Sequence, residues 1–307
     1  MKVKLFTHTD LDGVGCAIVT RHAFGNNVDV EYCDYNEIND KVSEFIKSES
    51  QDYDMIFITD ISVDENVAKE IENHIGDKTV LIDHHPTAKW LNKYKWATVE
   101  EFEESVDLNE EYVKSSGTSL FYDYLWKNYG LNNELLFELA EKIRRYDTWE
   151  WSTKYNDVHA KQLNDLLYIV GRNNFVNRFV NDPSIELRDN EKFLLNIEQD
   201  RIDNYIKKKA ENLRRVNILN YKAGVVFAEQ YNSELGNALA KQNPDLDFIA
   251  IINMASNKVS YRGIKDDIDL GKDVAKIFGG GGHPKAAGSQ FDEELTSELI
   301  KKIFSVK

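Results

Sequence analysis

The sequence predicts an α/β fold in which a parallel-sheet domain is joined by a helical connection to a smaller α+β domain. Three observations support this prediction. Short apolar runs alternate with helical patterns over the first 83 residues, a polar and mostly helical stretch follows, and strand-like runs return after residue 217. Regular alternation of strands and helices is typical of a parallel sheet covered by helices. A chain of 307 residues is long enough for two compact domains.

Four apolar runs organise the first domain, which we place at residues 1–183. Each run is too short for a helix and is continuous rather than alternating, as expected for strands buried on both faces of a parallel sheet. The predicted strands cover residues 3–7, 28–33, 55–59 and 79–82, and the helices between them cover 13–24, 36–48 and 64–74. The order is therefore βαβαβαβ, and two further helices are predicted at 118–129 and 133–146.

Alternating charges between residues 184 and 215 predict a long, largely exposed helix, so we assign residues 184–216 to a helical linker. Residues 217–307 then form the second domain. Its predicted strands cover 223–228, 247–253 and 258–262, and its predicted helices cover 233–242 and 270–278. This mixture predicts a small α+β domain.

The charge balance limits the partners of the protein. The chain carries 53 acidic and 38 basic residues, a formal net charge of -15. Residues 220–307 contain 11 basic and 12 acidic residues, which leaves -14 of this charge on the first 219 residues. Such a chain lacks the basic surface that grips a long duplex through many phosphates. We therefore expect no long duplex as a partner, and only short or cation-bridged polyanions as substrates.

The sequence predicts a cytoplasmic protein without a membrane partner. No apolar run has the length that a membrane span needs, and no signal-peptide pattern is present at the start of the chain. Cys16 and Cys33 are too few for a disulfide framework and have apolar neighbours, so a buried thiol is favoured over a nucleophile at Cys16. A homodimer is left open.

Carboxylates and imidazoles directly follow three of the predicted strands. The first strand runs into His8, Asp10 and Asp12, the third into Asp60, and the fourth into the Asp-His-His triplet at 83–85. Side chains at the carboxyl ends of parallel strands converge on one crevice. Carboxylates brought together there repel one another unless a cation lies between them. Oxygen ligands with a few imidazoles suit Mn²⁺ or Mg²⁺ better than a structural zinc ion.

The stretch from His8 to Val14 allows three interpretations. In an extended chain, His8, Asp10 and Asp12 would point to one side and could bind two adjacent ions, after which Gly13 would let the chain turn into the helix. Alternatively, the carboxylates only cap that helix. In the third interpretation, Asp-x-Asp-Gly-Val resembles the motif of haloacid dehalogenase-like phosphatases, and Asp10 would be a covalent nucleophile. That motif accounts for neither His8 nor residues 83–85.

A second motif near the C-terminus completes a family resemblance. Residues 279–284 read Gly-Gly-Gly-Gly-His-Pro, and residues 286–288 read Ala-Ala-Gly. Together with His8-x-Asp-x-Asp, Asp60 and the triplet at 83–85, they resemble the DHH phosphoesterase superfamily with its DHH-associated C-terminal domain. Within it, the first motif is similar to that of NrnB-type oligoribonucleases, or nano-RNases, and cyclic-nucleotide phosphodiesterases. The resemblance implies an active site in the cleft between the two domains.

The resemblance also implies a centre of two Mn²⁺ ions, with Mg²⁺ or Co²⁺ as substitutes. The implied ligands are His8 and Asp10 for the first ion, Asp12, His84 and Asp147 for the second, and Asp60 between both. Asp83 would orient an imidazole, and His85 would face the phosphate, either as an acid or as a charge stabiliser. Water activated by the ions, with Asp60 as the bridging catalytic carboxylate, would attack phosphorus directly. The alternative interpretation of Asp147 is the N-cap of a helix at residue 148.

From its residues alone, the glycine run is either a flexible loop or a phosphate cradle of bare backbone N–H groups, with Gly279 ending the preceding helix. The resemblance favours a cradle formed by Gly280, Gly281, Gly282 and His283. It also assigns Arg262 to a second phosphate. Two choices stay open: Tyr261 either stacks on a base or packs, and Arg144 either contacts phosphate or balances nearby acids.

The implied function is that of an exoribonuclease, a phosphodiesterase that hydrolyses short RNA oligonucleotides to mononucleotides. The expected partners are therefore short RNA or small phosphorylated nucleotides. An adenosine bisphosphate phosphatase and a cyclic (di)nucleotide phosphodiesterase of the same superfamily remain alternatives, since they would use the same ions. From a different class, a nucleotide-binding regulator with an inactive centre is also retained.

Overall fold

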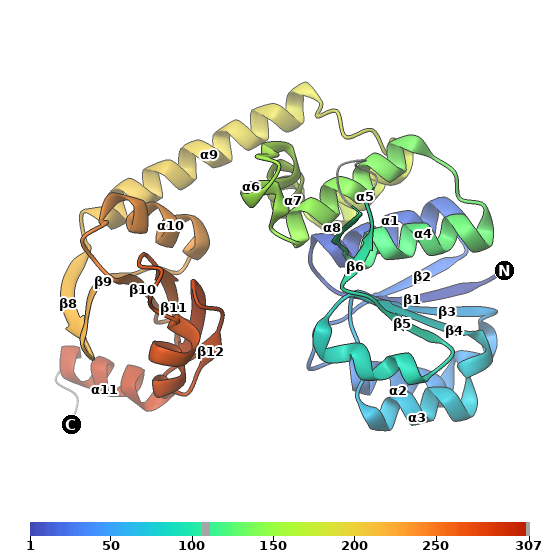
Figure 1. The fold of residues 1–307 in the computed structure, drawn as a ribbon, viewed down its shortest axis with the longest axis horizontal. Helices are drawn as coiled ribbons and strands as arrows, with labels where there is room; N and C mark the ends of the chain where they lie inside the picture. Colours follow the sequence, from blue (N-terminus) through green and yellow to red (C-terminus); the bar gives the residue numbers. More distant parts are fainter. Residues whose placement is uncertain (106–110, 305–307) are drawn as a thin grey trace. The chain divides into compact units, whose positions relative to one another are not determined.

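The computed structural model describes residues 1–105 and 111–304. These residues belong to two compact units, Met1–Leu195 and Asn196–Lys307 (Figure 1). The division falls inside helix α9 (Asp189–Ala210), in the segment where the sequence predicts a helical linker. Leu195 packs in a core of the first unit, whereas Tyr205 and Ile206 pack in a core of the second. The helix therefore takes part in both units instead of lying exposed along its whole length.

A five-stranded parallel sheet forms the centre of the first unit, as predicted (Figure 1). Its strands are β1 (Val3–Thr7), β2 (Val28–Tyr32), β3 (Met55–Thr59), β4 (Thr79–Asp83) and β5 (Ala97–Val99), in the order β2-β1-β3-β4-β5. The order places β3 between β1 and β4, so the three strands that end in carboxylates and imidazoles are neighbours. Strand β5 was not predicted, because three residues are too few to show a hydrophobic pattern.

Helices cover both faces of this sheet. One face carries α1 (Leu11–Phe24), α4 (Gly117–Tyr129), α5 (Glu134–Asp147), α7 (Val158–Val170) and α8 (Arg172–Asn181), and the other carries α2 (Ile38–Ser48) and α3 (Glu65–His74). Shorter helices are α6 (Glu150–Thr153), η1 (Ser50–Asp52), η2 (Gly76–Lys78) and η3 (Pro86–Lys93). Each face has its own apolar core, which is why the strands read as continuous apolar runs.

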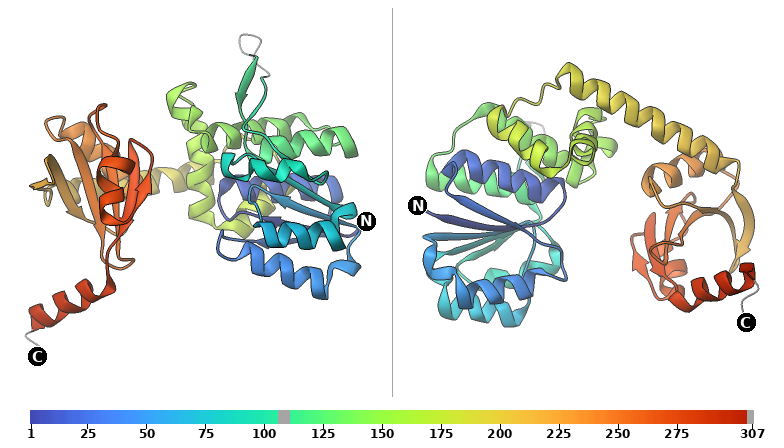
Figure 2. Two further views of the ribbon diagram at one scale, coloured as in Figure 1. Left: turned by 60° about the horizontal axis from the view of Figure 1, so that its bottom comes forward. Right: turned by 180° about the vertical axis from the view of Figure 1, so that it is seen from behind.

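A short antiparallel hairpin, β6 (Phe102–Glu104) and β7 (Tyr112–Lys114), lies between β5 and α4 and stands out from the first unit in the left view of Figure 2. Hydrogen bonds hold its base. The Glu100 N–H donates to the carbonyl of Asp83 at 3.1 Å, and the Ser115 N–H donates to the carbonyl of Glu101 at 3.1 Å. No sequence pattern predicts this hairpin, and its base is tied to the end of β4.

The second unit contains a six-stranded sheet in the order β12-β13-β11-β10-β9-β8. Its elements are β8 (Arg214–Ile218), β9 (Tyr221–Phe227), α10 (Asn232–Gln242), β10 (Phe248–Asn253), β11 (Lys258–Gly263), β12 (Gly281–Gly282), β13 (Ala286–Gln290) and α11 (Glu293–Phe304). The pair β9 and β10 is parallel, and the other pairs are antiparallel. The predicted helix at 270–278 is instead a π-helical turn, η4 (Leu270–Val274), followed by a 3-10 turn, η5 (Ala275–Phe278).

Within the described ranges, none of the helices combines the length and the apolar character that a membrane crossing requires.

Candidate metal centre

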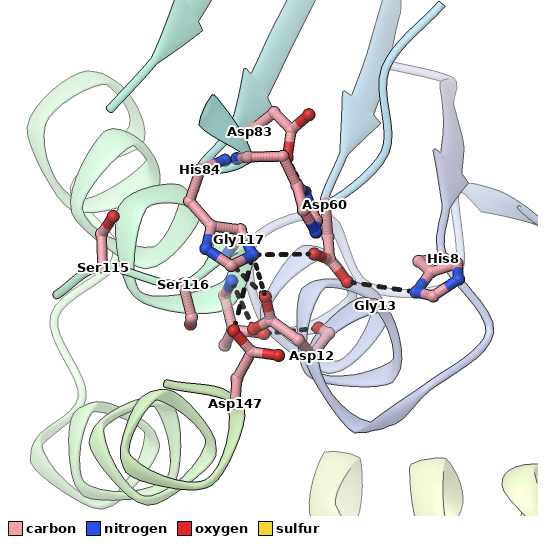
Figure 3. A network of polar contacts seen from close by, with 12 residues as sticks. His8, Asp12, Gly13, Asp60, Asp83, His84, Ser115, Ser116, Gly117 and Asp147 are labelled. Carbon is pink, nitrogen blue, oxygen red and sulfur yellow. Dashed lines mark hydrogen bonds and ion pairs between the residues drawn. The ribbon is translucent and has the colours of Figure 1, made fainter. Parts of the chain in front are cut away.

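The neighbouring ends of β1, β3 and β4 bring the predicted site residues together (Figure 3). His8 follows β1, Asp60 follows β3, and Asp83 is the last residue of β4. Asp60 has φ = 57°, a left-handed backbone conformation that is uncommon for residues other than glycine. Such local strain persists where the surrounding structure imposes it, often at functional sites.

The segment from His8 to Asp12 is not extended, so this part of the prediction was wrong. Helix α1 already begins at Leu11, and Asp10 is its N-cap, accepting a hydrogen bond from the Gly13 N–H at 3.1 Å. The Asp10 carboxylate therefore both caps helix α1 and forms part of the site. Gly13 lies within the helix, where a Cβ atom would be 2.2 Å from the carbonyl oxygen of His8. The glycine is required for this close approach and not for a turn.

Asp12 lies buried in the first turn of α1, and the N-terminus of α4 holds its carboxylate. The backbone N–H of Gly117 donates to Oδ2 at 2.6 Å, and that of Thr118 donates to Oδ1 at 2.9 Å. A Cβ atom at Gly117 would lie 2.5 Å from Cβ of Asp60, so only glycine fits there. Sequence reasoning missed these two residues, although Ser116 and Ser119 form a capping box before an apolar helix.

Three groups of side chains among the described residues have the composition of a metal site, and one of them, Asp60 with Asp83, His84 and His85, overlaps the other two. The first ligand group is His8, Asp10 and Asp60, the second ligand group is Asp12, His84 and Asp147, and within each group the ligand atoms lie within 4.8 Å of one another. Asp60 faces both groups: its Oδ2 is 3.9 Å from Nδ1 of His8, and its Oδ1 is 3.4 Å from Nε2 of His84. Asp147 Oδ2 lies 3.5 Å from the same Nε2 atom. The residues that the family resemblance assigns to each ion thus lie together.

The chemistry of these groups fits divalent cations. His8 Nδ1, Asp60 Oδ2 and His84 Nε2 are buried and have no hydrogen-bond partner among the residues that the structure describes. His8 Nδ1 lies 2.9 Å from Asp10 Oδ2, but without the alignment of a hydrogen bond. Burial, together with the neighbouring carboxylates of Asp12 and Asp10, raises the pKa of Asp60 and of Asp147 well above the usual value. Cations between these groups would satisfy the unpaired atoms and remove the repulsion.

Asp83 orients His85 rather than His84. The Asp83 carboxylate accepts hydrogen bonds from Nδ1–H of His85 at 2.7 Å and from the hydroxyl of Ser62. The bond to Asp83 raises the pKa of the His85 imidazole. Tyr35 completes this arrangement, with its hydroxyl 3.4 Å from Nε2 of His85 and its ring centre 4.9 Å from that of His8. Tyr35 is not among the predicted site residues, because one tyrosine after a strand forms no recognisable motif.

Helix α5 places Asp147 at its last position, so Asp147 is not the N-cap of a following helix. Arg144, one turn earlier, is buried and forms ion pairs of 2.7 Å with Glu141 and with Glu150. It therefore balances acids instead of contacting phosphate. Cys16 is also buried, and burial raises the pKa of its thiol, as expected for a packing residue.

The second unit contains the predicted substrate-binding residues. Arg262 on β11 donates to the carbonyl of Tyr261 and to the hydroxyl of Ser233, each at 2.9 Å, and burial lowers the pKa of its guanidinium. Tyr261 is buried, and its hydroxyl lies 2.9 Å from that of Ser289, so it packs and is not available for stacking on a base.

The glycine run is part of a sheet, which corrects the prediction of a row of bare N–H groups. Gly281 and Gly282 form β12 and pair with β13. The N–H of Gly280 donates to the carbonyl of Ala275, and that of His283 donates to the carbonyl of Ala286, both at 2.8 Å. These two N–H groups are already used, and the exposed imidazole of His283 remains available for a ligand.

Comparison with known proteins defines the class. Residues 2–145 match the DHH family, N-terminal domain. The chain is 38% identical over 311 residues to the oligoribonuclease NrnB of Bacillus subtilis, an alignment that covers 98% of this chain and 76% of the relative. The chain therefore belongs to the DHH family and is a phosphoesterase, a hydrolase of phosphodiester bonds. This confirms the family resemblance and removes the haloacid dehalogenase-like alternative.

A more distant relative is the 3',5'-cyclic-nucleotide phosphodiesterase of Helicobacter pylori, which is 22% identical over 372 residues. The alignment covers 99% of this chain and 99% of the relative. Among solved structures, RecJ in complex with Mn²⁺ from Thermus thermophilus has a TM-score of 0.54 at 13% identity, with 98% of this chain and 51% of that chain covered. At this identity the likeness shows a shared fold.

Proposed function

We propose that this protein is a cytoplasmic, manganese-dependent exoribonuclease that hydrolyses short RNA oligonucleotides to mononucleotides with two metal ions. The observation that carries the proposal is that Asp60, a member of the first ligand group, also faces the second: its Oδ2 lies 3.9 Å from His8 Nδ1 and its Oδ1 lies 3.4 Å from His84 Nε2. The first ligand group would hold one ion and the second ligand group the other. Carboxylate oxygens outnumber imidazole nitrogens in this set, which favours Mn²⁺ or Mg²⁺ over zinc.

The ions, when bound, would lower the pKa of an attacking water and offset charge on the phosphate. The protein itself fixes the ligands. The N-terminus of α4 holds the Asp12 carboxylate through two N–H groups, and the strained backbone of Asp60 fixes its carboxylate between the two groups. His85 is bound to Asp83 through Nδ1, so its Nε2 can donate a proton to the leaving nucleoside oxygen.

The proposal for RNA as substrate is supported by the relative from Bacillus subtilis, which is an oligoribonuclease and aligns with nearly the whole chain. Arg262 supports a phosphate contact in the second unit, because its hydrogen bonds go to a neutral carbonyl and a neutral hydroxyl rather than to a carboxylate. His283 would add an imidazole at the rim. The net charge of -15 suits a short substrate, whose few phosphates are met by metal ions and these two residues.

The decisive experiment incubates the protein with labelled di- to pentaribonucleotides and resolves the products over time. We expect mononucleotide release with Mn²⁺, less with Mg²⁺ or Co²⁺, and none after chelation. Matched deoxyribonucleotides, adenosine bisphosphate and cyclic (di)nucleotides serve as competing substrates. Faster hydrolysis of one of these would replace the RNA assignment while keeping the phosphoesterase centre, and activity that survives chelation would contradict the metal mechanism.

Metal stoichiometry tests the two-ion centre without turnover. Calorimetric titration with Mn²⁺ should find two sites in the wild-type protein, and Asp147→Asn should weaken one of them selectively, because Asp147 belongs only to the second ligand group. A single site in the wild-type protein would contradict the two-ion proposal.

A further inference from the structure

A pocket of about 240 Å³ opens beside the second ligand group, on the side of the β6–β7 hairpin. The residues around it include His84, Asp147, Phe102 and Lys114. Glu101 also lines it, and its carboxylate pairs with Lys89 at 2.5 Å. Its volume is below the roughly 300–1,000 Å³ that is usual for pockets of drug-sized ligands. It has room for a single small ring system next to the proposed metal centre. None of the motifs in the sequence accounts for it.

The hairpin presents an aromatic ring and a positive charge to this pocket. Phe102 and Lys114 are direct partners in the β6–β7 ladder, and such partners project from the same face of an antiparallel pair. The Phe102 side chain is 54% exposed, although burial of an aromatic ring is favourable. Lys114 is exposed and forms no ion pair within the part of the chain that the structure describes. Both groups are therefore available to a ligand.

Partly buried hydrogen bonds fix the hairpin relative to the metal centre. Nη1 of Arg144 donates to the carbonyl of Lys114 at 2.7 Å, and Arg144 lies on α5, the helix that ends at Asp147. The hydroxyl of Ser115 donates to the carbonyl of Glu100, and the Glu100 N–H donates to the carbonyl of Asp83. The pocket wall and the proposed ligands are thus parts of one connected structure, as a preorganised subsite requires.

We infer that this pocket is a nucleobase subsite for a nucleotide adjoining the scissile phosphate. Phe102 stacks on the base, and Lys114 contacts a phosphate of the same strand. The inference rests on the proposed function and specifies which part of the first unit recognises the substrate. Stacking on an aromatic side chain tolerates any base. The subsite therefore distinguishes nucleotides from phosphodiesters that lack a base, but it does not distinguish one base from another.

The test compares three variants on substrates with and without a base. Phe102→Ala removes the ring, Phe102→Trp keeps a stacking surface, and Tyr112→Ala is the control, because Tyr112 is 58% exposed on the same hairpin but does not line the pocket. The substrates are a diribonucleotide and its two analogues that lack the base of the 5' or the 3' nucleotide. Thermal unfolding of each variant confirms that it is folded.

Loss of one base should lower kcat/KM of the wild-type protein and of Tyr112→Ala about tenfold or more. In Phe102→Ala, loss of the same base should lower kcat/KM only slightly. In Phe102→Trp, it should lower kcat/KM as much as in the wild type. An equal cost in Phe102→Ala and in the wild type for both analogues would overturn the inference, as would a Tyr112→Ala variant that behaves like Phe102→Ala.

Equilibrium binding of adenosine monophosphate separates this inference from the proposed function. Affinity should fall about tenfold in Phe102→Ala and remain unchanged in Tyr112→Ala. If the wild-type protein fails to hydrolyse diribonucleotides yet shows this binding pattern, the exoribonuclease assignment fails and the subsite stands. Unchanged binding in Phe102→Ala overturns the subsite whatever the substrate.

Discussion

The acidic cluster of the first unit and the glycine run of the second are both prominent motifs, but their residues are used differently. In the cluster, side chains from three strand ends meet, and three of their buried polar atoms have no hydrogen-bond partner in the described part of the chain. In the glycine run, Gly281 and Gly282 pair with β13, and the N–H groups on either side of them donate to carbonyl oxygens. The cluster is incomplete without a ligand, whereas the glycine backbone is largely satisfied by the protein.

The difference shows what a motif of each kind demands. Buried carboxylates repel one another, and packing alone does not remove this cost, so a cluster of them implies a cation. Glycines can instead be required by the backbone itself, for a positive φ or for a close approach between two segments. Gly279 adopts φ = 72°, and a Cβ atom at Gly280 would lie 2.0 Å from the carbonyl oxygen of Gly288. A glycine run by itself is therefore weaker evidence for a ligand than a carboxylate cluster.

The largest effect is expected for Asp60→Asn, which keeps the shape and tolerates the left-handed backbone but removes the carboxylate charge that faces both ligand groups. Activity with Mn²⁺ should fall at least about a thousandfold. Thermal unfolding without metal should show a more stable protein, because the repulsion with Asp12 and Asp10 is relieved. Asp64→Asn, at the exposed N-cap of α3, is the control and should retain activity. A metal-free Tm that decreases in Asp60→Asn would contradict the description of the cluster.

Next in size is the contrast between two neighbouring glycines. Gly280→Ala forces a methyl group against the backbone of Gly288 and should cost about 3 kcal/mol of unfolding free energy. Gly281→Ala meets open space and should leave Tm unchanged. Equal Tm values would contradict the close backbone contact. A raised KM in Gly281→Ala would place a phosphate contact at that position, and an unchanged KM would leave His283 as the contact of this segment.

A smaller effect is expected for Asp83→Asn. The variant loses the charged hydrogen bond to His85 while the first and second ligand groups remain complete. We expect kcat to fall about 10- to 100-fold, with Mn²⁺ affinity, measured by calorimetry, changing much less. Equal losses of kcat and of metal affinity would show that Asp83 supports the ligands and not His85.

The smallest effect concerns Glu103, a largely buried carboxylate outside the cluster. Burial raises its pKa from 4.5 to about 8, so the folded protein retains a proton that the unfolded chain has already released. Unfolding free energy therefore falls as pH rises from 4.5 towards 8. Glu103→Gln should stabilise the protein by about 1–2 kcal/mol at pH 9 and have little effect below pH 4.5. Denaturant unfolding at both pH values, with Glu104→Gln as the exposed control, measures this difference.

The sequence by itself predicted the parallel sheet and the chemistry at its edge. Continuous apolar runs predict the strands, and His8, Asp60 and Asp83 stand where three of those runs end. Because the carboxyl ends of parallel strands meet at one crevice, the local sequence is enough to predict that these side chains lie together. The family resemblance added Asp147, which no local pattern could assign because it ends a helix far along the chain.

Only the tertiary structure decided how the site is held and what surrounds it. The N-terminus of α4 binds Asp12 across 105 residues, Tyr35 reaches His85 across 50, and the hairpin wall beside His84 consists of strands too short to show a pattern. The use of the glycine N–H groups likewise depends on pairing with β13. These are contacts between segments distant in sequence, and packing sets their geometry. Strand periodicity and charge, in contrast, depend only on residues that are neighbours in the sequence.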